Sequence, residues 1–399
     1  MSLLLRSVLL GATVAAVLAP SALPSDASRS SGASEPLAVS QRPIYYTLGR
    51  VDPATLSPTG KQVELFQTGT PVLSPARRWV AFSGGPFHGI SLASAAPLRP
   101  PGRLIPLPRG HVLALAWPKA HRLLALAGRD SRYPAACCRT LRLYVVDPLQ
   151  RRVLRRVRLP RGLVIAVKPT RSGLAILLGG YGKLASARLL LVTGSGAVRT
   201  VALARFRVGA TKLGKNGAFV TVAALTVGPG SAYVLGRSKA RPALAVAPLT
   251  GGHAVYHTLP ADPELFQPDQ ALVLLPGGRL GIASVAGLYV YDTHTWQEVG
   301  SVPFQAKAGF ISGDTMVVLD DGSGMDVYNL DGSLRYHVYT SAQVDSAFFV
   351  GGRAFLAYQG GDSWSALDLE TGTLQAPVYG GVPELIPGQP GVPAVAWTP

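Results

Sequence analysis

Long helices and long apolar runs are scarce in this chain of 399 residues. Beyond the N-terminus no segment has the spacing of an amphipathic helix, and apolar residues occur in short runs that end at Gly or Pro. The 45 glycines and 33 prolines supply turns for many short strands. Because 48% of the residues are hydrophobic, these strands can bury a large core. The sequence therefore predicts an all-β protein.

Recognisable catalytic and metal-binding motifs are also missing. The seven histidines lack the spacing of metal ligands, and no Ser-His-Asp order, carboxylate pair or phosphate-binding glycine loop stands out. The segment 320–324 begins like a calcium loop but lacks the later ligands and the terminal Glu, which favours an ordinary turn. We therefore expect no metal site, and we favour a protein that is not an enzyme.

Acidic residues are rare in the first half of the chain. Residues 1–215 hold 31 Lys and Arg against 6 Asp and Glu, whereas residues 216–399 hold 7 against 15. The net charge of +17 is therefore concentrated in one half. Two interpretations stay open: a functional basic face, or charges that only keep strand edges soluble.

Residues 1–27 have the features of a signal peptide, with Arg6 near the start, an apolar stretch from 8 to 18 and small residues after it. The stretch is short for a transmembrane helix, and no cysteine is present to carry a lipoprotein anchor. We expect cleavage and export, with an uncleaved anchor as the alternative and no membrane span in the mature chain. Residues 28–43 are expected to form a disordered lead-in rich in Ser, Ala and Pro, so that order begins near Ile44.

A two-part unit recurs along the rest of the chain. A turn between apolar strands appears at 117–122, 169–173 and 276–279, and a hairpin ending near Asp appears at 143–148, 288–293 and 364–368. The corner position of these hairpins recurs about every 45 residues. It falls at Asp52, with a poor match near Ala93, and then at Asp147, Thr193, Pro248, Asp292, Asn329 and Asp368. A repeat of about 40–50 residues with four short strands is typical of a β-propeller blade.

These units predict a single closed β-propeller of seven or eight four-stranded blades over residues 44–397, with eight favoured. The chain begins with the hairpin 44–66, which lacks an inner strand pair, and 385–397 has the pattern of that missing pair. We therefore expect both termini to build the last blade and close the ring. A C-terminal contribution of one strand or none favours seven blades.

The turn at 73–82 and the Leu-Tyr-Val-Tyr-Asp hairpin at 288–292 resemble the WD-repeat-like, YVTN-type and Tol-system propellers. The segment 368–373 resembles the same group, but no Gly-His and Trp-Asp pair recurs as in typical WD repeats. The group includes quinoprotein dehydrogenases, in which two adjacent cysteines lie beside a quinone cofactor. The adjacent Cys137 and Cys138 match that feature, whereas the repeated tryptophan-docking motif is absent.

Cys137 and Cys138 are the only cysteines and lie in the long insertion 128–140. In an oxidising compartment they tend to pair, and the bond is strained because adjacent Cα atoms are only about 3.8 Å apart. A vicinal disulfide is one interpretation, with the pair acting as a platform under a ligand or as a redox-sensitive latch. A reduced, incidental pair in a surface loop is the other.

The segment 151–161 concentrates arginines on one hairpin, and it is the candidate site for an anionic ligand. Its candidate residues are Arg151, Arg155, Arg156, Arg158 and Arg161. Strand alternation predicts that Val153, Arg155, Val157 and Leu159 share one face and that Leu154, Arg156 and Arg158 share the other. Guanidinium groups suit phosphate, teichoic-type polymers or anionic lipid, while a solvated strand edge is the alternative. Nucleic acid is not expected, because aromatic residues do not interleave the run.

We therefore expect an exported, monomeric binding or scaffolding module of the cell envelope, with an envelope protein or an anionic cell-surface polymer as partner. The alternative is a propeller enzyme, either a lactonase-like hydrolase or a dehydrogenase that uses pyrroloquinoline quinone with calcium. A motif search does not exclude such an enzyme, because propeller active sites collect single residues from many blades.

Overall fold

The computed structural model divides the chain into two units, Met1–Ser34 and Glu35–Pro399. It describes parts of the second unit only. The described ranges are 35–41, 46–52, 55–65, 71–83, 89–102, 104–108, 110–128, 140–181, 183–212, 219–239, 241–259, 271–284, 287–303, 308–319, 324–340, 343–350, 352–358, 363–379 and 383–386. None of these residues lies in a helix, so no described helix is long and apolar enough to cross a membrane.

The described strands form antiparallel groups of consecutive strands. The first sheet contains β1 (Leu37–Gln41), β2 (Tyr46–Arg50), β3 (Val63–Leu65) and β34 (Glu384–Leu385). The second sheet contains β4 (Val72–Leu73), β5 (Trp79–Ser83), β6 (Gly89–Ala95), β7 (Leu98–Arg99) and β8 (Ile105–Pro106). The next sheet contains β9 (His111–Lys119), β10 (Arg122–Gly128), β11 (Leu141–Asp147) and β12 (Arg152–Leu159).

A nine-stranded sheet follows. It contains β13 (Leu163–Thr170), β14 (Gly173–Tyr181), β15 (Ala185–Thr193), β16 (Val198–Lys212), β17 (Phe219–Val222), β18 (Ala224–Val227), β19 (Ser231–Ser238), β20 (Arg241–Pro248) and β21 (Val255–Thr258). Its groups β13–β16 and β18–β21 are joined where Phe206 and Arg207 of β16 pair with Ser238 and Arg237 of β19.

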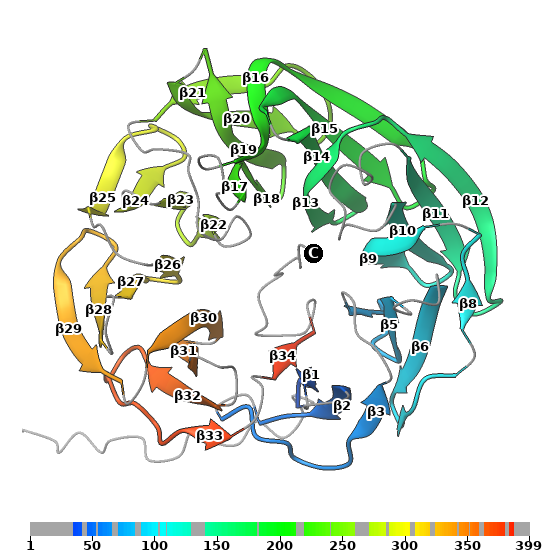
Figure 1. The fold of residues 1–399 in the computed structure, drawn as a ribbon, viewed down its shortest axis with the longest axis horizontal. Helices are drawn as coiled ribbons and strands as arrows, with labels where there is room; N and C mark the ends of the chain where they lie inside the picture. The colour runs from blue at the N-terminus through cyan, green and yellow to red at the C-terminus, as the bar shows by residue number, and fades with distance from the viewer. Residues whose placement is uncertain are drawn as a thin grey trace, which may run out of the picture. The chain divides into compact units, whose positions relative to one another are not determined.

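Three four-stranded sheets complete the described fold. They contain β22 (Leu272–Leu275), β23 (Arg279–Ser284), β24 (Gly287–Asp292), β25 (Glu298–Pro303); β26 (Ala308–Ser312), β27 (Thr315–Leu319), β28 (Gly324–Asn329), β29 (Leu334–Tyr339); and β30 (Val344–Val350), β31 (Arg353–Tyr358), β32 (Ser363–Asp368), β33 (Val378–Tyr379). Within Glu35–Pro399, Figure 1 shows the groups following one another around a ring in sequence order.

Burial decreases from the inner strands of each group to the outer strand. All five residues of β27 are buried, as are six of the seven in β10, because such strands have neighbours on both faces. In the outer strand β12, five of eight residues are exposed. The apolar runs of the sequence therefore correspond to inner strands, and the charged runs correspond to outer ones.

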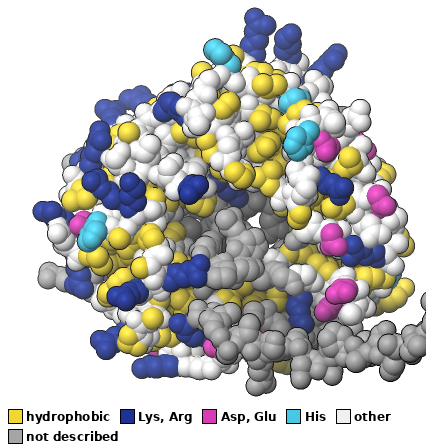
Figure 2. Space-filling model, turned by 180° about the vertical axis from the view of Figure 1, so that it is seen from behind, with side chains coloured by type: hydrophobic (Ala, Val, Ile, Leu, Met, Phe, Trp, Pro, Cys, Tyr) yellow, Lys and Arg dark blue, Asp and Glu magenta, His cyan; other side chains and the backbone are white. Residues whose placement is uncertain are grey.

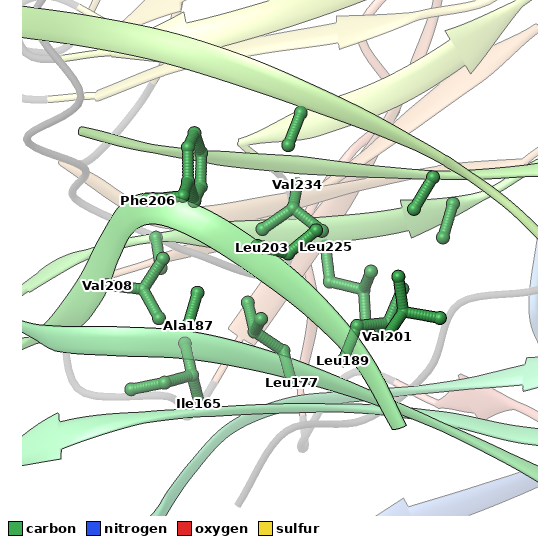
Figure 3. Packing of buried hydrophobic residues seen from close by; sticks show 14 of the residues in the cluster. Ile165, Leu177, Ala187, Leu189, Val201, Leu203, Phe206, Val208, Leu225 and Val234 are labelled. Carbon is green, nitrogen blue, oxygen red and sulfur yellow. The ribbon is translucent and has the colours of Figure 1, made fainter. Parts of the chain in front are cut away.

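The core lies between neighbouring groups rather than inside any one sheet. The cluster in Figure 3 joins β13–β16 to β18–β21, with Leu177, Leu189 and Phe206 facing Leu225 and Val234. Similar clusters join each later pair of successive groups. Two further clusters place β1–β3 and β34 between β30–β33 and β4–β8. Burial of apolar faces thus links the groups in a continuous series.

Aspartates cap the turn between the third and fourth strands of several groups, as the recurring corner position predicts. The Asp147 Oδ1 atom accepts hydrogen bonds from the backbone N–H groups of Leu149 and Gln150 at 3.1 and 3.0 Å. Asp292 and Asp368 make the same pattern with the second and third residues after them. These bonds lower the pKa of both carboxyl groups, because they favour the charged form. Asp147, Asp292 and Asp368 therefore occupy the predicted corner position.

The outer strand of one group holds that turn in the next group. Arg155 Nη1 donates to Ser195 O at 3.5 Å, and Arg199 donates to the carbonyls of Leu249 and Thr250. The His257 ring stacks on Trp296 with 3.9 Å between the ring centroids. Tyr336 Oη donates to Leu369 O at 2.7 Å. At Gly300 the approach is backbone to backbone, since a Cβ there would lie 1.9 Å from Leu330 O. Different side chains thus serve one repeated contact.

The first described strand differs from the prediction. Strand β1 occupies Leu37–Gln41, inside the segment 28–43 expected to be a disordered lead-in, and its Leu37, Ala38 and Val39 are buried. The reason is that this short apolar stretch pairs with β2 on one side and with β34 on the other. Among the described residues, the C-terminal segment supplies one strand to this sheet instead of the expected inner pair, because β1 takes the second inner place. Residues 387–397 lie outside the described part.

Replacing Leu37 and Ile386 by Ala tests how the two ends are joined. Both side chains are buried in one cluster, so each single substitution should lower the free energy of unfolding by about 2–4 kcal/mol. The double variant should lose less than the sum by at least about 0.5 kcal/mol, because the two share a cavity. Urea unfolding measures all three. The control pair Leu37→Ala with Leu319→Ala joins different clusters and should be additive; additivity of the first pair contradicts the contact.

The stack of His257 on Trp296 predicts a pH dependence of stability. Burial lowers the pKa of His257 from its ordinary value of 6.5, so the folded state disfavours the charged ring. A lowered histidine pKa stabilises the fold above pH 6.5, and that contribution is lost as the pH falls below it. The His257→Gln variant should therefore lose less thermal stability than the native protein between pH 7.5 and about 5. The His253→Gln variant is the control for removing an exposed histidine, and equal slopes in native protein and His257→Gln contradict this effect.

Candidate anion-binding site

The described residues between 110 and 212 carry a large excess of exposed positive charge. Thirteen Lys and Arg are exposed there, and the single acidic residue, Asp147, is 5% exposed. The cations are Lys119, Arg122, Arg151, Arg152, Arg155, Arg156, Arg158, Arg161, Arg171, Lys183, Arg199, Arg205 and Arg207. We call this set the basic sector. In Figure 2 Lys and Arg gather on the left and at the top, and most Asp and Glu lie on the right. Strands β9–β15 lie on the right and upper right of Figure 1 and β16 reaches its top, and this side is the left and top of Figure 2.

Asp147 does little to neutralise the basic sector, because it supplies one negative charge against thirteen cations and is held at its own turn. It accepts the two turn N–H groups described above, and its Oδ2 lies 3.7 Å from His121 Nδ1. Surface cations without nearby carboxylates generate a positive potential that attracts anions over roughly the Debye length. The electrostatic potential over the basic sector is therefore positive throughout.

Six cations of the basic sector converge at one end of the sheets. They come from the turns β9–β10, β11–β12, β13–β14 and the start of β16, and they are Lys119, Arg122, Arg151, Arg152, Arg171 and Arg199. The turns of neighbouring groups abut, since a Cβ on Gly194 would lie 3.1 Å from Pro118 Cγ. We call this end the basic turn face. Sequence reasoning missed it because the residues are spread over 81 positions; the recurring Lys or Arg in the turns was the available signal.

A hollow opens on this face between β13–β16 and β20. Its volume is about 380 Å³, and Leu174, Leu191 and Leu249 give it an apolar floor. Thr170, Ser172, Thr193 and Thr250 supply hydroxyl groups around it. Arg199 borders the hollow while donating to the carbonyls of Leu249 and Thr250. The hollow therefore combines apolar contact with one cation and several hydroxyls.

The five arginines predicted from the run 151–161 do not form one site. Arg151 lies in the β11–β12 turn, whereas Arg161 follows the opposite end of β12, and an eight-residue strand spans about 26 Å. Arg155 reaches the next group, where it donates to Ser195 O. Arg156 and Arg158 remain exposed on the outer strand. The run therefore crosses the rim of the protein from one end of the sheets to the other.

The predicted faces of this strand need a correction. The ladder between β11 and β12 shifts between Val145 and Val146, which leaves Leu154 without a paired residue. As a result, Val153 packs against the cluster shared with β4–β8, whereas Val157 packs against the cluster shared with β13–β16. The prediction that Val153 and Val157 share a face is wrong, because a bulge reverses the alternation.

The remaining candidate features lie elsewhere. Cys137, Cys138 and residues 320–323 are outside the described residues, so the disulfide, the quinone and the calcium-loop interpretations stay predictions. In the described part of the chain, no group of three or more His, Cys, Asp or Glu is arranged to hold a metal. Away from the basic sector, His337 Nδ1 lies 2.6 Å from Asp326 Oδ1, and Tyr328 Oη donates to Asp326 Oδ2 at 3.2 Å.

No protein-family model matches the chain, and no curated protein matches its sequence. Solved structures match. Dihydro-heme d1 dehydrogenase NirN, in complex with DHE, gives a TM-score of 0.59 at 14% identity over 87% of this chain and 73% of that one. BamB from Moraxella catarrhalis gives 0.50 at 12% identity over 80% and 92%, and apo AztD from Citrobacter koseri gives 0.50 at 9% over 88% and 96%.

All three are β-propeller proteins. The fold is a β-propeller. The predicted propeller fold is therefore confirmed, and the four-strand groups correspond to blades. At 9–14% identity the likeness concerns the fold alone, so the function of this propeller must be argued from its own surface.

Proposed function

We propose that this protein is an exported, non-enzymatic binding module whose basic sector docks an anionic polymer of the cell envelope. The observation that carries the proposal is the exposure of thirteen cations, with no exposed acidic residue, over the described part of 110–212. Charge kept only for solubility would be expected to mix both signs. The acidic residues after 260 show that this chain tolerates Asp and Glu on the same scaffold.

The geometry of the basic turn face supports a polymer rather than a small ion. Its six cations come from the turns of two adjacent blades, so contacts extend over several turns, and one of them, Arg199, borders the hollow of about 380 Å³. A repeating anion can meet several of these side chains at once, which raises its apparent affinity through effective concentration. The residues 1–27, with the pattern of a signal peptide, support an exported chain.

We further infer eight blades. Counting β13–β16 and β18–β21 as separate blades gives eight groups, and eight buried clusters alternate with them. The last blade combines β34 with β1–β3, and it packs against the blades on both sides of it. Strand β1, which was not expected from the sequence, is what gives this blade four strands.

The proposal predicts salt-sensitive retention on a glycerol-phosphate polymer. Replacing Lys119, Arg122, Arg152 and Arg171 by Gln should weaken binding by at least about tenfold at low salt, since each cation near an anionic surface contributes about 1 kcal/mol. Raising salt from 0.05 to about 0.5 M should weaken native binding similarly, because screening shortens the Debye length. Arg155 and Arg199 are left intact because they hold neighbouring turns.

Retention on a polymer column and the melting temperature are measured together. The matched control replaces Lys61, Arg99, Arg241 and Arg279, which are equally exposed but lie outside 110–212, and it should bind more strongly than the turn-face variant. Both variants should melt close to the native protein, because exposed charges contribute little to stability. Equal loss of retention in the two variants means that only net charge matters, and it overturns the proposal.

A further inference from the structure

One guanidinium nitrogen is buried without a hydrogen-bond partner in the blade β9–β12, which carries much of the basic sector. Arg142 lies on β11, and its Nη1 atom is buried with no hydrogen-bond partner among the described residues. A buried N–H group of a charged side chain without an acceptor lowers the stability of the fold. A ligand that places an oxygen at this atom would remove that cost.

The register of the sheet brings a second arginine beside Arg142. Arg142 pairs with Arg158 across β11 and β12, and Tyr144 pairs with Arg156 one step along the same face. Directly opposed residues have Cβ atoms about 4.5–5.5 Å apart, at which like charges repel. Because Tyr144 belongs to the cluster shared with β4–β8, Arg142 and Arg158 also face the wedge between these two blades.

The described residues of these two blades supply no carboxylate to this place. Their single acidic residue is Asp147, which lies five positions along β11 from Arg142, or about 17 Å away along a strand. Asp147 also points to its own turn, where it caps Leu149 and Gln150. The positive charge of Arg142 and Arg158 is therefore not balanced by the described part of either blade.

We propose that Arg142 and Arg158 bind one phosphoryl group at the outer end of this wedge. Two guanidinium forks offer several N–H donors in fixed planes, which match the oxygens of a phosphate better than the two oxygens of a carboxylate. A bound phosphoryl group supplies the acceptor that Arg142 Nη1 lacks and removes the repulsion between the two cations. This inference rests on the proposed function, because it names the chemical group of the polymer that the basic sector recognises.

Inorganic phosphate is the first probe, with isothermal titration of the full chain at low ionic strength as the measurement. Native protein should bind it at one site, and Arg142→Gln and Arg142→Lys should each weaken binding at least tenfold. The control variant Arg279→Gln changes an exposed arginine outside the basic sector and should bind within twofold of native. Lys fails because a single ammonium group does not form a fork. Arg158→Gln changes an exposed residue, so it tests the site even if the Arg142 variants do not fold. Native affinity in Arg158→Gln, or no binding to the native protein, overturns the proposal.

The alternative explanation is that a carboxylate of this chain serves Arg142, and Asp130 is the acidic residue to test because it lies outside the described residues. Under our proposal Asp130→Asn binds phosphate as the native protein does. Phosphate binding that appears only in Asp130→Asn means that the carboxylate occupies the place of the ligand, and it overturns the proposal.

A second probe separates the source of the phosphoryl group and separates this inference from the proposed function. If glycerol phosphodiester displaces inorganic phosphate from the site, the ligand is a polymer. If inorganic phosphate binds but glycerol phosphodiester does not displace it, the ligand is a free ion, and the site is still supported. Polymer retention that depends on the turn-face cations, combined with native binding in Arg158→Gln, leaves the proposed function intact and removes only this site. If the native protein is not retained on the polymer but still binds phosphate through Arg142 and Arg158, the site remains and the proposed function is removed.

Discussion

Each blade of this protein is stable because other blades cover both of its faces. Inner strands such as β10 and β27 are apolar on both sides, so neither face is compatible with water. A single four-stranded sheet of this kind would expose two apolar surfaces, and the clusters between blades remove both from water. The same constraint explains why β34 is paired with β1 and why Ile386 is packed beside Leu37, since an unfilled place would leave two neighbouring blades with exposed faces.

The outer strands have a second task, which is to hold the next blade in position. Arg155, His257 and Tyr336 are chemically different, yet each contacts the turn between the third and fourth strands of the following blade. Because these contacts use carbonyl oxygens or ring faces, they place few demands on sequence identity. Some arginines of the basic sector are therefore structural, and the others are left available for a ligand.

The sequence predicted the parts of the fold that depend on local patterns. Apolar runs, Gly and Pro turns and the Asp corners at 147, 292 and 368 identified the strands and their repeat, because each is decided within one hairpin. Strand β1 was missed because its five residues follow a segment rich in Ser, Ala and Pro, and its partner β34 is more than 340 positions away. The faces of β12 were misassigned because the bulge at Leu154 depends on pairing with β11. The basic turn face was missed because it forms only when separate turns abut.

Strand β16 is fifteen residues long and continues past its own blade to pair with β19 of the next. Two blades are thereby joined by backbone hydrogen bonds as well as by side-chain packing. Sliding or tilting of one against the other would break that ladder, so the pair should move as one body. The two sides of the hollow, with Leu174 and Leu191 on one blade and Leu249 on the next, are then held at a constant separation. A ligand that fits this hollow would lose little affinity to ordering the protein on binding, whereas a hinge between the two blades would first have to be closed.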